Sequence, residues 1–139
     1  MNMFFFDEFL NNTILIDSLR TQENNYASSG EASSNNREFG VGFCQEYYNG
    51  LKVLQLHQRK KVKHFFFGPF RVKHEFEGDI PKAIIIGWKI TCRRNCDDNY
   101  CGSWRRLGQV LGTNHFQFLV TSCFMRDLDW ELNIYYICN

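Results

Sequence analysis

The sequence contains little proline, carries almost no net charge and has no long apolar run. Only two of its 139 residues are proline, and the formal charge at pH 7 is +1. No stretch reaches the roughly 18 consecutive apolar residues that a transmembrane helix needs. The composition therefore argues against a membrane-spanning helix, and the net charge alone favours no class of partner.

The first ten residues argue against a secretory signal peptide. The segment from Met1 to Leu10 is apolar, but Asp7 and Glu8 interrupt it, no basic residue precedes it and no small-residue cleavage site follows. We therefore expect an intracellular location, in the cytoplasm or nucleus. An extracellular location remains open because the chain has six cysteines, an even number that suits disulfide bonds.

Motifs for catalysis or cofactor binding are absent as well. The segment GQVLG, at residues 108–112, lacks the third glycine and the Lys-Ser/Thr pair of a phosphate-binding loop. No serine lies in a G-x-S-x-G frame, and the four histidines have neither metal-ligand nor triad spacing. We predict that the protein is not an enzyme and binds no cofactor.

Aromatic residues, in contrast, are abundant and make up 17% of the chain. They supply enough apolar area for a buried core. Residues 20–38 are rich in Ser, Asn and Glu, so burial there cannot offset the entropy lost on ordering. We predict an N-terminal arm with a polar flexible linker over residues 1–38 and a single β domain over residues 39–139. The apolar residues at 3–19 form no helical stripe, so a short helix and two short strands both remain open there.

The β domain is predicted from alternating apolar and polar residues. Asn49-Gly50 is a hairpin turn signal, which makes residues 51–57 a strand and residues 39–48 its partner. Further strands are expected at residues 70–77, 83–92, 115–124 and 131–138, and a short helix at residues 104–111. This spacing predicts an all-β, mainly antiparallel domain that forms a small β-sandwich or barrel.

One segment, from Arg59 to His74, combines basic and aromatic residues. It supplies our candidate binding residues: Arg59, Lys60, Lys61, Lys63, Phe66, Phe67, Arg71 and Lys73. Cations that neutralise phosphates beside a ring that stacks on a base are typical of proteins that bind single strands. The same combination suits an anionic membrane surface. The purely structural interpretation is that the rings are core residues and the lysines keep a hairpin turn soluble.

The cysteines form a second constellation, with the pattern C-x3-C-x4-C. Our disulfide candidates are Cys92, Cys96, Cys101, Cys123 and Cys138. The first four would also be enough to supply the four ligands of a structural zinc site. Their spacing is irregular, however, and no second pair of closely spaced cysteines follows. Without a signal peptide we expect reduced thiols. Arg93 and Arg94 beside Cys92 should lower the pKa of that thiol and make it reactive.

Taken together, these features favour a non-enzymatic binding module that contacts a protein partner. One alternative is binding of single-stranded nucleic acid or RNA through residues 59–74. A second alternative is binding to an anionic membrane surface. All three interpretations depend on a β scaffold that presents rings beside cations.

Overall fold

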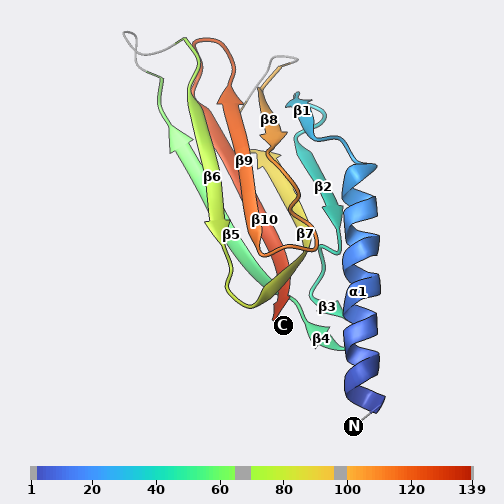
Figure 1. Cartoon of the computed structure of the whole chain (residues 1–139). Helices are drawn as coiled ribbons and strands as arrows, with labels where there is room; N and C mark the ends of the chain where they lie inside the picture. The colour runs from blue at the N-terminus through green and yellow to red at the C-terminus, as the bar shows by residue number, and fades with distance from the viewer. Residues whose placement is uncertain (1–2, 65–69, 96–99, 139) are drawn as a thin grey trace.

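The computed structural model describes residues 3–64, 70–95 and 100–138, and for residues 3–12 it describes the backbone alone. Along this part of the chain one helix precedes ten strands (Figure 1). The elements are α1 (Met3–Asn24), β1 (Ser29–Ala32), β2 (Glu38–Gly42), β3 (Tyr47–Tyr48), β4 (Leu51–Lys52), β5 (Leu54–Val62), β6 (Lys73–Asp79), β7 (Ala83–Cys92), β8 (Gly102–Arg106), β9 (His115–Ser122) and β10 (Leu128–Cys138).

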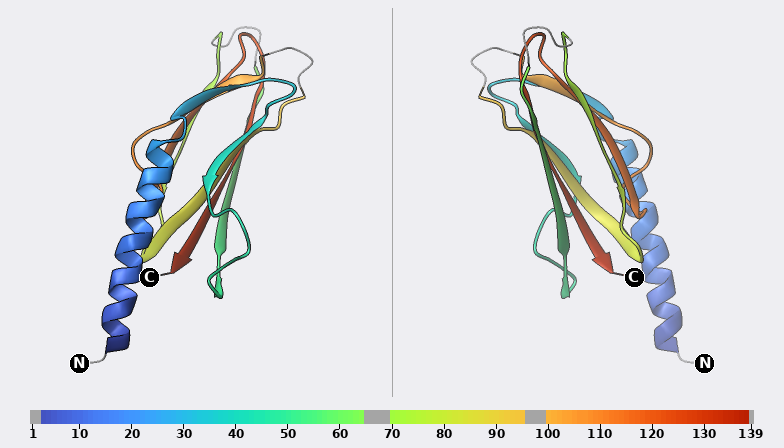
Figure 2. Two further views of the ribbon diagram at one scale, coloured as in Figure 1. Left: turned by 90° about the vertical axis from the view of Figure 1, so that its right-hand side faces the viewer. Right: turned by 90° about the vertical axis from the view of Figure 1, so that its left-hand side faces the viewer.

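The strands form two four-stranded antiparallel sheets that pack as a sandwich, seen from two further sides in Figure 2. The first sheet has the order β1-β8-β9-β6 and the second has the order β2-β7-β10-β5. The short strands β3 and β4 pair only with each other. This arrangement confirms the predicted all-β, antiparallel sandwich.

Trp88 of β7 lies at the centre of the core between the sheets. The centroid of its ring lies 4.9 Å from that of Phe118 on β9 and 5.4 Å from that of Trp104 on β8, both in the facing sheet. Tyr26, which follows α1, makes an edge contact with Trp88 at 5.8 Å. Every residue of β7 except Lys89 is buried. A strand covered on both faces explains the nearly continuous apolar sequence of this segment.

Most of the predicted strands are present. The strand at residues 83–92 is confirmed with the same bounds as β7, and those at residues 70–77, 115–124 and 131–138 are confirmed as β6, β9 and β10 with shifted ends. In β9 the residues alternate between half-buried and fully buried. The two-residue period was therefore a reliable signal wherever one face of a strand meets the core.

One predicted element is wrong and another is confirmed only in part. The hairpin at Asn49-Gly50 is present, since Tyr47 and Tyr48 pair with Lys52 and Leu51. The rest of the predicted partner strand at residues 39–48 does not belong to it, because β2 pairs with β7. The positive φ angles of Asn49 (46°) and Gly50 (79°) fit this tight turn. Residues 104–111 are not a helix, because β8 runs to Arg106 and places Trp104 in the core. In both cases contacts between distant segments outweigh the local pattern.

The N-terminal segment is more ordered than expected. A helix at residues 3–19 was one of the two open alternatives, and α1 is that helix, extended to Asn24. The flexible linker predicted at residues 20–38 instead contains the end of α1 and the strand β1, which pairs with β8. Leu19 on α1 and Ala32 on β1 are fully buried. Helix formation here depends on docking a few residues onto the sandwich rather than on an apolar stripe.

The helix α1 lies along the side of the sandwich formed by β1 and β2 (Figure 1). Its residue Ile16 lies so close to Gly112, in the loop between β8 and β9, that a Cβ atom at Gly112 would be 3.2 Å from Ile16 Cγ2. Among the described residues no helix is both long and apolar enough to cross a membrane.

Six strand ends meet at the end of the sandwich opposite the two chain termini. These are the last residues of β5, β7 and β9 and the first residues of β6, β8 and β10 (Figure 1). We call this the loop end. It brings together segments that are more than sixty residues apart in sequence, since Lys63, Arg94 and Arg126 all lie there.

Candidate functional site

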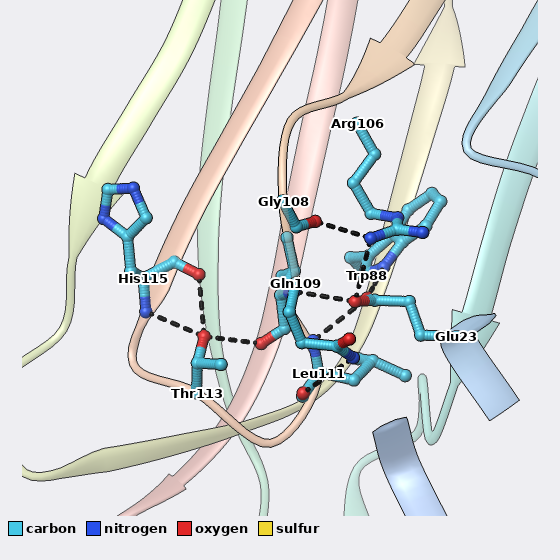
Figure 3. A network of polar contacts seen from close by, with 9 residues as sticks. Glu23, Trp88, Arg106, Gly108, Gln109, Leu111, Thr113 and His115 are labelled. Atoms are coloured by element: carbon cyan, nitrogen blue, oxygen red, sulfur yellow. Dashed lines mark hydrogen bonds and ion pairs between the residues drawn. The ribbon is translucent and has the colours of Figure 1, made fainter. Parts of the chain in front are cut away.

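Glu23, at the last turn of α1, is fully buried between the helix and the sandwich (Figure 3). Its Oε2 accepts hydrogen bonds from Trp88 Nε1 at 2.8 Å and from the backbone N–H of Leu111 at 2.9 Å. Its Oε1 accepts hydrogen bonds from the backbone N–H of Val110 at 2.7 Å and from Arg106 Nη1 at 3.2 Å. A carboxylate has about four acceptor sites, so Glu23 is saturated. It joins the helix to both sheets and is not a free acid that could act on a substrate.

The outer face of the second sheet carries a network of ion pairs. Arg59 on β5 donates two hydrogen bonds to Asp129 on β10, both at 3.0 Å. Glu131 on β10 pairs with Arg93 at 2.7 Å and with His57 at 3.1 Å. The hydrogen bond from Arg93 is the main cause that lowers the pKa of Glu131 from 4.5 to about 2. In this network, therefore, each arginine is matched by a carboxylate.

A pocket of about 670 Å³ opens at the loop end, next to this network. Four cationic side chains line it: Lys61, Lys63, Arg94 and Arg126. Two acids also line it, but Asp129 is held by Arg59, and Asp127 accepts a hydrogen bond from the backbone N–H of His64 at 2.7 Å. Across residues 3–64, 70–95 and 100–138, none of the four cations forms an ion pair. The pocket therefore concentrates uncompensated positive charge.

Arg94 contributes a buried donor that has no acceptor. Its Nη1 atom is covered but makes no hydrogen bond to any described residue. Its backbone carbonyl, in contrast, accepts a hydrogen bond from Arg37 Nη1. An unpaired buried donor costs about 1–3 kcal/mol, and more when the group is charged. Only an acceptor that reaches this atom would remove this cost.

Exposed apolar side chains lie beside the pocket. Phe70 and Phe124 stack with centroids 5.4 Å apart and an interplanar angle of 18°, although they are 67% and 53% exposed. Met125 is 42% exposed, lines the pocket and donates its backbone N–H to the carbonyl of Phe70 at 2.6 Å. We use the name loop-end surface for these three residues together with the four cations of the pocket: Phe70, Phe124, Met125, Lys61, Lys63, Arg94 and Arg126.

The structure separates the binding residues that were predicted from the sequence. Lys61 and Lys63 lie in the pocket, whereas Arg59 belongs to the ion-pair network. The other described candidates are exposed on edge strands or next to them: Lys60 on β5, Lys73 on β6 and Arg71 just before β6. Phe66 and Phe67 lie outside the described residues.

Five residues of the loop-end surface were not predicted as binding residues from the sequence. Phe70 was assigned only to the strand at residues 70–77. Arg94 was noted only as a neighbour of Cys92, and Arg126 and Met125 were not singled out. Phe124 was placed on the buried face of a strand, but β9 ends at Ser122 and leaves its ring exposed. A usable signal was the basic and apolar composition of the residues that directly follow two predicted strands.

The cysteines do not gather into a metal site in the part of the chain that the structure describes. Cys101 is disulfide-bonded. Free thiols are found at Cys44, Cys92, Cys123 and Cys138, and Cys96 lies outside the described residues. Of the described disulfide candidates, three are therefore free, and the expectation that the thiols are reduced fails at Cys101.

The predicted reactivity of Cys92 is also corrected. This thiol is buried, and burial raises its pKa, although the hydrogen bond with the backbone of Arg94 and the charges of nearby arginines act in the opposite direction. Its Sγ lies 3.5 Å from the carbonyl oxygen of Cys101. A thiol that is covered and protonated is a poor nucleophile.

No protein-family model, curated protein or solved structure matches this chain. The fold defines its class as an antiparallel β-sandwich closed on one side by an N-terminal helix. The chemistry of the loop-end surface is therefore the best guide to the function of this chain.

Proposed function

We propose that the protein is a non-enzymatic binding module that contacts a protein partner through the loop-end surface. The observation that carries this proposal is the exposed stack of Phe70 and Phe124 beside cations that have no acid partner among the described residues. Aromatic, Met and Arg side chains are enriched where proteins bind one another. A partner with an apolar side chain next to acidic groups would match both halves of this surface.

The rings supply the apolar part of such an interface. Full burial of an exposed Phe side chain contributes roughly 1.5–3 kcal/mol. Because Phe70 is 67% and Phe124 53% exposed, the two together offer roughly 2–4 kcal/mol before the costs of association are subtracted. Because the rings already stack on each other and Met125 is tied to the backbone of Phe70, little conformational entropy is lost on binding. The surface is therefore well prepared for a partner.

A selection from a random peptide library, with the full-length protein as bait, tests this proposal. We expect the enriched peptides to carry an aromatic or aliphatic residue close to Asp or Glu. The Phe124→Ser variant should bind these peptides at least about tenfold more weakly, as expected for an interface anchor. The matched control is Leu51→Ser, because Leu51 is 54% exposed on the β3–β4 hairpin, far from the loop end. Equal binding by wild type and Phe124→Ser, or no enrichment at all, would contradict the proposal.

A second candidate function, binding of single-stranded nucleic acid, is favoured by the same rings and lysines. Bases can stack on exposed aromatic faces while cations neutralise phosphates. It ranks lower because Asp129 and Glu131 neutralise Arg59 and Arg93, which interrupts any continuous cationic track along the sheet. Fluorescence anisotropy with labelled single-stranded DNA and RNA at low salt tests it, and anionic lipid vesicles in the same series test membrane binding. A flat response to each probe would remove the corresponding alternative.

A further inference from the structure

We propose that the cationic pocket at the loop end binds a phosphomonoester. For the source of that group we infer a phosphorylated serine or threonine of the protein partner, a step that rests on the proposed function. Three of the residues that line this pocket, Lys63, Arg94 and Arg126, come from three different connections of the sandwich.

The charge of the pocket matches this ligand. Four cations face one carboxylate, Asp127, that no cation neutralises among the described residues, since Asp129 is paired with Arg59. A phosphomonoester carries a charge of about −1.5 to −2 at pH 7 and has three strong acceptor oxygens. Such a group can accept hydrogen bonds from several of these side chains at once.

Arg94 is the residue that most directly supports a phosphate site. It lies directly after β7, and its backbone is fixed by the hydrogen bond from Arg37. Its Nη1 atom is buried and has no acceptor within the described chain. The planar guanidinium presents paired N–H groups whose spacing suits two phosphate oxygens, which a lysine cannot reproduce. Arg94 thus lines the pocket with donor capacity that none of the described residues uses.

The distribution of charge favours a phosphomonoester over the backbone of a nucleic acid. A phosphodiester has a single charge, and binding of a polymer requires cations that follow several successive phosphates. Here the cations that have no acid partner in the described part of the chain gather around one pocket, while the neighbouring Arg59 and Arg93 are held by carboxylates. One compact, doubly charged group fits this arrangement better than a chain of singly charged ones.

The experiment is a titration of the full-length, isotope-labelled protein followed by two-dimensional NMR. The probes are inorganic phosphate, a capped phosphoserine, the capped serine without phosphate, and a thymidine dinucleotide that contains one phosphodiester. We expect saturable shifts of the backbone amides around Arg94 and Arg126 with phosphate and with phosphoserine. The dinucleotide should bind at least about tenfold more weakly, and the unmodified serine should not bind.

Variants separate the pocket from a general charge effect. Arg94→Gln should weaken binding of phosphoserine at least about tenfold, as expected for a charge-assisted hydrogen bond. Lys63→Gln, at an exposed position that should tolerate the change, is a second variant with a loss in the same direction. The control is Arg105→Gln, which removes the same charge from an exposed position on β8 outside the pocket. It should bind like wild type.

Three results would overturn the inference. The first is a titration that does not saturate at about 20 mM inorganic phosphate, a concentration well above a Kd of about 1 mM. The second is wild-type affinity for phosphoserine in the folded variants Arg94→Gln and Lys63→Gln. The third is tighter binding of the dinucleotide than of phosphoserine. The two proposals also fail separately. If peptides bind through Phe124 but phosphate does not bind, only the phosphate site is lost. If phosphate binds through Arg94 but no peptide needs Phe124, the phosphate site stands and the proposed protein interface is lost.

Discussion

From the hydrogen bonds that Glu23 accepts, we predict that the Glu23→Gln variant is much less stable than wild type. The amide of Gln has nearly the same shape as the carboxylate, but one of its two ends is a donor. If this NH2 group replaces Oε2, it faces the donors of Trp88 and Leu111; if it replaces Oε1, it faces those of Val110 and Arg106. Either orientation leaves two buried donors without an acceptor.

The magnitude follows from these two donors. Each unpaired buried donor costs about 1–3 kcal/mol, so the free energy of unfolding should fall by about 2–6 kcal/mol. That is a large part of the roughly 5–15 kcal/mol that stabilises a typical domain. Removal of one partner from a buried ion pair, here the pair of Glu23 with Arg106, acts in the same direction.

Urea unfolding, followed by tryptophan fluorescence, measures this loss, and hydrogen exchange locates it. The amides of Val110 and Leu111 should exchange at least about tenfold faster in Glu23→Gln than in wild type. The matched control is Glu31→Gln, because Glu31 is exposed on β1 and its replacement should change stability by no more than about 0.5 kcal/mol. If Glu23→Gln unfolds at the same urea concentration as this control and both amides stay protected, the reasoning about the buried carboxylate is refuted.

Three further predictions concern single residues. The pKa of Glu131 is lowered to about 2, so its pair with Arg93 stabilises the fold fully above about pH 4.5. This contribution disappears as the pH falls toward 2. The urea midpoint of the Glu131→Gln variant should therefore fall less steeply with decreasing pH than that of wild type. Burial raises the pKa of Cys44 to about 11, so iodoacetamide at about pH 8 should label exposed Cys138 long before Cys44, as peptide mass mapping can show. Gly50→Ala should cost about 1 kcal/mol in urea unfolding, because Gly50 has a φ of 79° but open space around it.

The sequence was sufficient for the fold class and for the central strands. Segments such as residues 83–92 and 115–122 meet the core along their whole length, so burial imposes a pattern that can be read directly. The helix at residues 3–24 could not be predicted in this way. It is attached through Leu19 and through the buried carboxylate of Glu23, and the acceptors and donors of that contact lie more than sixty residues apart in sequence.

The candidate site could be predicted only in part for a related reason. The basic run led to Lys61 and Lys63, but sequence order alone does not reveal that Arg94 and Arg126 lie beside them. It also does not reveal which cations are neutralised. Arg59 and Lys61 are two residues apart on the same face of β5, yet only Arg59 has an acid partner within the described structure.

The register of β5 against β10 explains this difference and leads to a last prediction. Lys61 lies directly opposite Asp129, but Arg59 holds both oxygens of that carboxylate. The Arg59→Gln variant should release Asp129 to pair with Lys61 and to repel an anion. Phosphoserine should then bind several-fold more weakly, although Arg59 does not line the pocket. The double variant Arg59→Gln/Asp129→Asn should regain most of the affinity in the same NMR titration. If Arg59→Gln binds like wild type, or if the double variant is as weak as the single one, then the neutralisation of Asp129 by Arg59 does not control the charge of the pocket.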